Sequence, residues 1–196
     1  MIRTHELVGV LLTALLLPIG RTRPATAAAE DDPMKPDEQT YGKPNPNAAP
    51  ELSRFAFLIG NWRGEAKLKR DEGTWDNLKV EWEGRYILDG YAIADEYRMT
   101  TPAGERLVLG MNFRSYDAKN KTWNLKWLNA LAGTWTDLGP EELGGVKVDE
   151  KAITYKMKEH DLGKSTAAHM LTRATYTNFS ENHFTWRGER SRSLTV

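Results

Sequence analysis

Runs of alternating apolar and polar residues, separated by turn signals about every ten residues, occupy this chain from residue 60 to residue 190. A period of two is typical of half-buried β-strands, because successive side chains of a strand point to opposite faces. The clearest run has two sets of alternate positions, which we call its two parities. One parity holds the apolar residues Leu78, Val80, Trp82, Tyr86 and Leu88, and the other holds the charged residues Lys79, Glu81, Glu83 and Arg85. Asp89-Gly90 follows as a two-residue hairpin signal, so residues 91–99 are expected to return antiparallel.

Later segments continue the pattern without helical periodicity over ten residues, which indicates an antiparallel meander. A wide sheet with one apolar face exposes its edges unless it closes on itself. The sequence therefore predicts an all-β fold, a single up-and-down antiparallel barrel of about eight to ten strands. One further strand is expected with the inward row Leu107, Leu109, Met111 and Phe113. The remaining strands are expected at Trp123, Leu125 and Trp127, around Trp135, and at 145–148, 153–158, 166–179 and 183–190.

A change of period marks the start of the barrel in FLIGNWRGEAKLKR, residues 57–70. Before it, Leu52, Phe55 and Ile59 recur at helical spacing, which predicts a short helical turn. After it, Trp62 and the alternate residues that follow have strand spacing. The stretch is thus predicted to join a helical turn to the first strand.

The N-terminus has the order of a secretory signal peptide, with an apolar run from Leu7 to Gly20 and the small residues Ala25 to Ala29. We expect cleavage before Glu30, so that residues 1–29 are the signal peptide and the product is periplasmic or secreted, without a stable membrane span. An uncleaved anchor is the alternative, favoured by Arg21 and Arg23 after the apolar run. Residues 30–50 hold five prolines and predict a flexible tether, and residues 51–196 form one barrel domain.

Composition excludes several classes of function. The chain has no cysteine, which excludes disulfides, thiol catalysis and cysteine-ligated zinc. Beyond residue 29 acidic residues exceed basic ones by two, and no strongly basic stripe is visible, so nucleic acid is not an expected partner. No cofactor or metal is expected either. His169, the best-placed histidine for haem, has the parity of Leu171 and Arg173, and Glu159-His160-Asp161 is typical of a solvated loop.

The helical turn followed by Gly60-Asn61-Trp62 resembles the opening of lipocalin-like (calycin-type) barrels. More closely, the chain is similar to the bacterial family called domain of unknown function 1579, over about residues 52–128. The matching segments are 57–64, Tyr86 to Gly90, and Met111 to Asp117 leading to Lys121-Thr122-Trp123. The resemblance implies a lipocalin-like barrel and carries no catalytic residues. Relatives of this type continue through one more strand after a segment like 186–191, so a closing C-terminal strand is expected to be missing and the barrel to have an open seam.

The interior is where we expect a site, because a barrel of this size holds either side chains or one small ligand. Asp95 is the most informative residue, since it lies on the apolar parity between Ile93 and Tyr97. It could orient a polar ligand group or act as a base; the alternative is a rim position or a pair with an arginine such as Arg114. Asn129 is a second polar candidate, or a turn residue at a strand end. The predicted ligand-binding residues are Trp82, Asp95, Tyr97, Met111, Trp127 and Met170.

Three functions remain open on these residues. The first is an exported barrel that binds a small apolar or amphipathic molecule in its interior. The second is an isomerase or hydrolase in the same cavity, with Asp95 and Tyr97 as acid–base partners. The third is a filled barrel that acts through protein interactions of its outer surface. An open cavity with converging polar groups would favour the enzyme, an open apolar one the binder, and a solid interior the surface protein.

Overall fold

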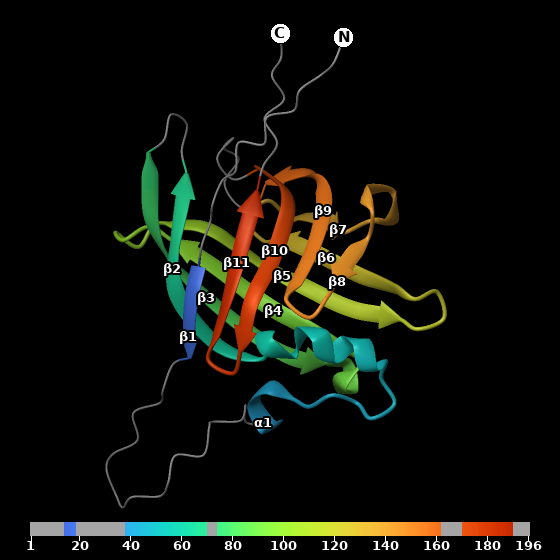
Figure 1. Cartoon of the computed structure of the whole chain (residues 1–196). Helices are drawn as coiled ribbons and strands as arrows, with labels where there is room; N and C mark the ends of the chain where they lie inside the picture. Colours follow the sequence, from blue (N-terminus) through green and yellow to red (C-terminus); the bar gives the residue numbers. More distant parts are fainter. Residues whose placement is uncertain (1–13, 19–37, 70–73, 162–169, 190–196) are drawn as a thin grey trace, which may run out of the picture.

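The chain folds into a curled sheet of eleven strands with a short helical segment at its base (Figure 1). The computed structural model describes residues 14–18, 38–69, 74–161 and 170–189. Its helical segments are α1 (Glu38–Tyr41) and the 3-10 turns η1 (Pro50–Leu58), η3 (Leu88–Gly90) and η4 (Glu141–Leu143). Its strands are β1 (Ala14–Pro18), β2 (Gly60–Lys69), β3 (Trp75–Ile87), β4 (Ala92–Thr100), β5 (Arg106–Asp117), β6 (Thr122–Asn129), β7 (Thr134–Leu138), β8 (Val146–Val148), β9 (Ala152–Asp161), β10 (Met170–Ser180) and β11 (His183–Glu189).

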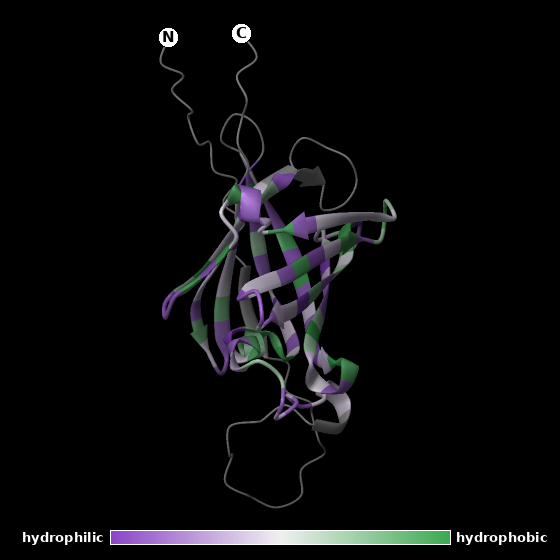
Figure 2. Ribbon diagram, turned by 90° about the vertical axis from the view of Figure 1, so that its right-hand side faces the viewer, coloured by the Kyte–Doolittle hydropathy of each residue, from purple (hydrophilic) through white to green (hydrophobic). Residues whose placement is uncertain are grey.

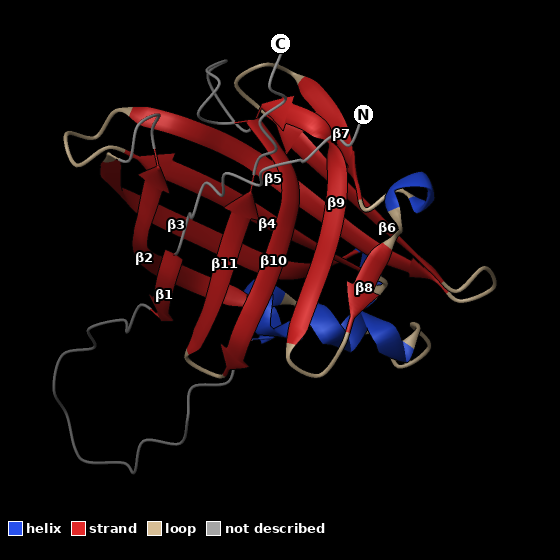
Figure 3. Ribbon diagram, turned by 45° about the horizontal axis from the view of Figure 1, so that its top comes forward, coloured by secondary structure: helices blue, strands red, loops and turns tan. Residues whose placement is uncertain are grey.

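The predicted all-β antiparallel fold is confirmed. The strand order is β7-β6-β5-β4-β3-β2-β1-β11-β10-β9-β8, and every neighbouring pair is antiparallel. The sheet curls until β7 meets β9, where the Gly139 N–H donates to the Lys156 carbonyl at 2.7 Å (Figure 3). The strand count exceeds the expected eight to ten because residues 14–18, within the predicted signal peptide, pair as β1 between β2 and β11.

The helical turn before the first strand is confirmed as η1, which lies across one end of the sheet (Figure 3). It buries Leu52, Phe55 and Leu58. The Trp62 indole Nε1 donates to the Leu58 carbonyl oxygen at 3.2 Å, so the tryptophan that opens β2 also ties β2 to η1. Gly84 on β3 lies directly under the same carbonyl, and a Cβ built there would be 2.0 Å from that oxygen. The glycine two residues after Trp82 therefore allows the close approach of η1 to β3.

Apolar and polar residues alternate along the strands (Figure 2), and the apolar parity of β2 and β3 faces inward as predicted. Trp62 and Trp82 are buried, whereas Arg63 and Lys79 are exposed. Rings from seven strands and η1 meet in the core, where Trp82 contacts Tyr97, Tyr176 and Phe184 edge-on. None of the helices described is long and apolar enough to cross a membrane.

Two predictions of orientation are wrong. On β5 the buried row is Val108, Gly110, Asn112 and Arg114, so the expected inward row is offset by one residue. The offset arises because the outer face of β5 is itself apolar: Phe113 packs there against Trp135, with ring centroids 5.6 Å apart. Leu88 was expected inside and is 72% exposed. Pairing ends at Ile87 with Ala92, and Leu88 enters the turn with a φ of 52°.

Candidate functional site

The barrel interior contains a charged group at the level where β4 and β5 face β10. Asp95 and Arg114 form an ion pair whose side chains have no exposed surface. Asn112 Nδ2 donates to Asp95 Oδ1 at 2.8 Å, and Arg114 Nη2 donates to the Tyr176 hydroxyl at 3.1 Å. The alternative weighed for Asp95, a pair with Arg114, is therefore the one that the structure contains. Such a buried pair is maintained only where further hydrogen bonds satisfy both ions.

The aromatic rings around Arg114 complete this group. Its guanidinium lies over the Phe55 ring of η1, 5.1 Å from the centroid. The Tyr155 and Tyr176 hydroxyls lie 3.4 Å apart and share one hydrogen bond. Burial raises the pKa of both phenols above the ordinary value, and burial also strongly raises the pKa of Tyr97. The three tyrosines are thus protonated donors at neutral pH, and none is poised as a base.

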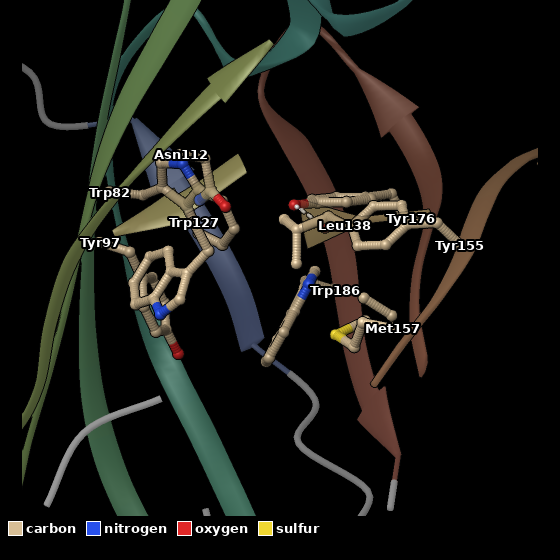
Figure 4. Close-up of a pocket in the computed structure, with 10 residues that line it drawn as sticks. Trp82, Tyr97, Asn112, Trp127, Leu138, Tyr155, Met157, Tyr176 and Trp186 are labelled. Carbon is tan, nitrogen blue, oxygen red and sulfur yellow. Dashed lines mark hydrogen bonds between the residues drawn. The ribbon is translucent and has the colours of Figure 1, made fainter. Parts of the chain in front are cut away.

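Next to the charged group lies an aromatic pocket, with rings facing one another from opposite walls (Figure 4). The free space at its centre is about 30 Å³, enough for no more than one or two water molecules. Pockets that bind drug-sized molecules measure about 300–1,000 Å³. The interior is therefore nearly filled by its own side chains. The lining residues are Trp82, Tyr97, Asn112, Trp127, Leu138, Tyr155, Met157, Ala174, Tyr176 and Trp186.

Five of the six predicted ligand-binding residues separate into three groups. Trp82, Tyr97 and Trp127 line the pocket. Asp95 lies behind Asn112 in the ion pair and does not line it. Met111 is on the outer face of β5, opposite Leu128, which corrects its predicted inward position.

Three other sequence candidates have separate outcomes. Met170 begins β10, and its side chain lies outside the described residues, as does the whole of His169. Asn129 is buried, but its Oδ1 accepts from the backbone N–H groups of Leu131 and Ala132. Asn129 is therefore a turn residue at the end of a strand, which was the alternative to a ligand-binding role.

Two polar atoms of the pocket wall have no hydrogen-bond partner in the described part of the chain. These are the indole Nε1 atoms of Trp82 and Trp127, whose side chains are buried. Gly110 makes room for the second indole, since a Cβ there would be 2.2 Å from a Trp127 ring carbon. Buried donors without an acceptor are costly, so a water or another acceptor-bearing group is the expected occupant of the small central space.

A much larger hollow, of about 540 Å³, lies on the outer face of β8–β11, beside the turn at residues 143–145. The outward residues of β9, β10 and β11 line it, because they have the parity opposite to buried Tyr155, Tyr176 and Trp186. Four cationic side chains, Lys147, Lys156, Arg173 and Arg187, are joined there by one carboxylate, Glu189, and by Thr154, Thr175, Thr177 and Thr185. We call this hollow the cationic groove.

Glu189 holds the two arginines of the cationic groove in place. It accepts a hydrogen bond from Arg173 at 3.1 Å and forms an ion pair with Arg187 at 2.8 Å, and its own side chain is only 13% exposed. Each arginine has further N–H groups beyond those that bind Glu189. Since the whole chain has no net charge, an excess of positive charge in one groove is a local feature of the fold. The groove is thus arranged to attract anionic groups.

Sequence reasoning missed the cationic groove because its four cations come singly from four strands. Along the chain they are at least nine residues apart, and the other basic residues between them are mixed with acidic and neutral ones, so no basic run is visible. The available signal was parity: Lys156, Arg173 and Arg187 all occupy outward positions, and antiparallel pairing puts Lys156 opposite Arg173. Finding the groove required the strand register.

Comparison with protein-family models, with curated proteins and with solved structures finds no match for this chain. The site is therefore interpreted from its own geometry.

Proposed function

We propose that this chain is an exported, non-catalytic binding protein that acts through its outer face and binds an acidic protein segment in the cationic groove. One contrast carries the proposal: the free space inside is about 30 Å³, whereas the cationic groove outside is about 540 Å³. The leader pattern of residues 1–29 supports export. The burial of Asp95, its ion pair with Arg114 and its bond from Asn112 support a role without acid–base chemistry.

The chemistry of the groove favours an extended acidic peptide over a nucleic acid. Threonine hydroxyls and cations can bind carboxylates and backbone carbonyls together. Single-stranded nucleic acids bind mainly by stacking bases on exposed aromatic rings. The one aromatic residue that contributes to the groove, Tyr155, is buried.

A fluorescence anisotropy titration with a labelled hexaglutamate peptide tests the proposal. The double variant Lys147→Glu/Lys156→Glu reverses two groove charges and leaves the Glu189 pairs intact. We expect it to weaken peptide binding by about tenfold, and we expect wild-type binding to weaken with added salt. The control Lys67→Glu/Lys79→Glu makes the same charge change on the exposed face of β2 and β3 and should leave binding within about twofold. Equal losses in both variants, or tighter binding of an oligothymidine of equal charge, would contradict the proposal.

Interior binding is a second candidate, favoured by the unpartnered indole donors of Trp82 and Trp127. Their chemistry fits a mostly apolar molecule with a hydrogen-bond acceptor, and a molecule larger than water would have to displace rings. Native mass spectrometry of the full chain, followed by solvent extraction, tests this candidate. A retained molecule that is lost on Trp127→Phe, which removes only the donor and one ring of the side chain, would support it. A mass equal to that of the bare chain would contradict it.

A further inference from the structure

The seam of the barrel between β2 and β11 is occupied by five residues of the predicted leader. Strand β1 pairs with β11 from Ala14 to Leu16 and with β2 from Leu15 to Pro18. Both neighbouring edges are thereby satisfied along β1. Without a strand in this position, each edge would present unpaired N–H and C=O groups.

Two core rings lie beneath the seam and contact each other without β1; we call these rings the floor of the seam. Trp62 of β2 and Phe184 of β11 meet edge-on beneath it, with ring centroids 5.1 Å apart. Phe184 is fully buried and also contacts Trp82 of β3. These contacts connect the two sides of the seam through the core.

Closing the seam by direct pairing of β2 with β11 would narrow the barrel. Two strands with a third between them lie about 9.6 Å apart, twice the spacing of paired strands. Direct pairing would therefore draw β2 and β11 together by about 4.8 Å. The interior has about 30 Å³ of free space in its central pocket, so the rings of the floor have little room to move inward. The filled core keeps the seam one strand wide.

We infer that the seam between β2 and β11 is a strand-acceptor site for a short, extended, apolar peptide, and that Ala14–Pro18 is its occupant in the unprocessed chain. Main-chain hydrogen bonds to both edges supply affinity, as in strand addition generally. The register fixes the position of each residue of the occupant: the central one, Leu16, is opposite Gly64 of β2 and Phe184 of β11. Pro18 lacks an N–H and suits the end of the strand.

This site is distinct from the cationic groove, and processing controls it. Removal of residues 1–29 would vacate the seam and leave an acceptor for an apolar strand of another chain. The leader would then have a structural role before cleavage in addition to its role in export.

The full chain with Leu16→Asp tests the inference, because a carboxylate at the central position opposes seating of the strand. We expect the thermal midpoint to fall by at least about 5 °C and amide exchange in β2 and β11 to quicken. Leu11→Asp, a matched change in the same apolar run outside β1, should do neither. A synthetic peptide, Lys-Lys-Ala-Leu-Leu-Leu-Pro-Lys, should then restore the midpoint of the Leu16→Asp chain and protect both strands.

The same peptide with aspartate in place of its middle leucine should have no effect. Equal midpoints for wild type and Leu16→Asp would overturn the inference, since β1 would then contribute nothing to the fold. A lowered midpoint that the peptide fails to raise at millimolar concentration would also overturn it, because the vacated seam would not be an acceptor.

Discussion

Asp95 and Arg114 face each other across β4 and β5 as an ion pair with no exposed side-chain surface. Breaking a buried pair from one side leaves an unpaired buried charge, which typically costs about 3–5 kcal/mol. We therefore expect Asp95→Asn to lower the free energy of unfolding by about this amount, as measured in urea. The double change Asp95→Leu/Arg114→Met removes both charges and should lose less than the single change. A loss near zero for Asp95→Asn would show that the pair is dispensable.

The inward position of Asp95 could be predicted from sequence, because it lies between Ile93 and Tyr97 on a clear apolar parity. Its partner Arg114 could be named only as an alternative, because the predicted inward row of β5 put Arg114 on the outer face. On β5 the apolar parity faces outward, since Met111 and Phe113 pack on the outer face, while the inward row carries Arg114 to meet Asp95. A period of two identifies the two faces of a strand, but it does not show which face points into the core. The register with the neighbouring strands determines which face is buried.

Leu88 gives a direct test of the corrected end of β3. Its φ of 52° lies in the left-handed region, where leucine is disfavoured by about 1–2 kcal/mol and asparagine is tolerated better. We expect Leu88→Asn to leave the free energy of unfolding unchanged or to raise it by up to about 1 kcal/mol. Leu78→Asn, at a buried position of β3, should lower it by more than about 3 kcal/mol. Similar losses of unfolding free energy in the two variants would indicate that Leu88 is buried in the core, against the position described here.

The close approach of β3 to η1 makes Gly84 sensitive to a single methyl group. A Cβ at Gly84 would be 2.0 Å from the Leu58 carbonyl oxygen, a backbone atom that cannot rotate away. We expect Gly84→Ala to lower the free energy of unfolding by at least about 3 kcal/mol, because β3 and η1 must separate. Gly104→Ala is the control, since Gly104 has a φ of 88° and nothing within 4 Å of its Cβ position. Its cost should be only the backbone strain, about 1 kcal/mol.

The helical turn and the first strands were predictable because their signals are local: a change of period, a hairpin dipeptide and runs of alternating apolar and polar residues. The cationic groove and the occupied seam were not, since each combines residues far apart in sequence. Arg173 and Lys156 become neighbours only through the β9–β10 register, and β1 meets β11 only after the whole sheet has curled.

The buried tyrosines predict how stability depends on alkaline pH. Burial raises the pKa of Tyr97, Tyr155 and Tyr176 above the ordinary value of 10.0, so the folded state retains protons that the unfolded chain releases. The unfolded state is then favoured as pH rises above 10, by about 1.4 kcal/mol per pH unit for each such tyrosine until its folded pKa is reached. Below pH 10 this contribution is fully present. We expect urea unfolding at pH 8, 10 and 11.5 to show a steep loss only above 10, together with a cooperative rise in phenolate absorbance.

Tyr97→Phe separates this effect from general alkaline damage. The Tyr97 hydroxyl donates only to the Met99 sulfur, at 3.6 Å, so its removal should change stability at pH 8 little. Above pH 10, however, one of the titrating groups is gone, and the loss of unfolding free energy per pH unit should fall by about 1.4 kcal/mol. Tyr91→Phe, at a half-exposed position outside the core, should leave the slope unchanged. If Tyr97→Phe and wild type lose stability at the same rate, the Tyr97 phenol ionises as readily in the folded state as in the unfolded chain, and the packed interior described for it would be wrong.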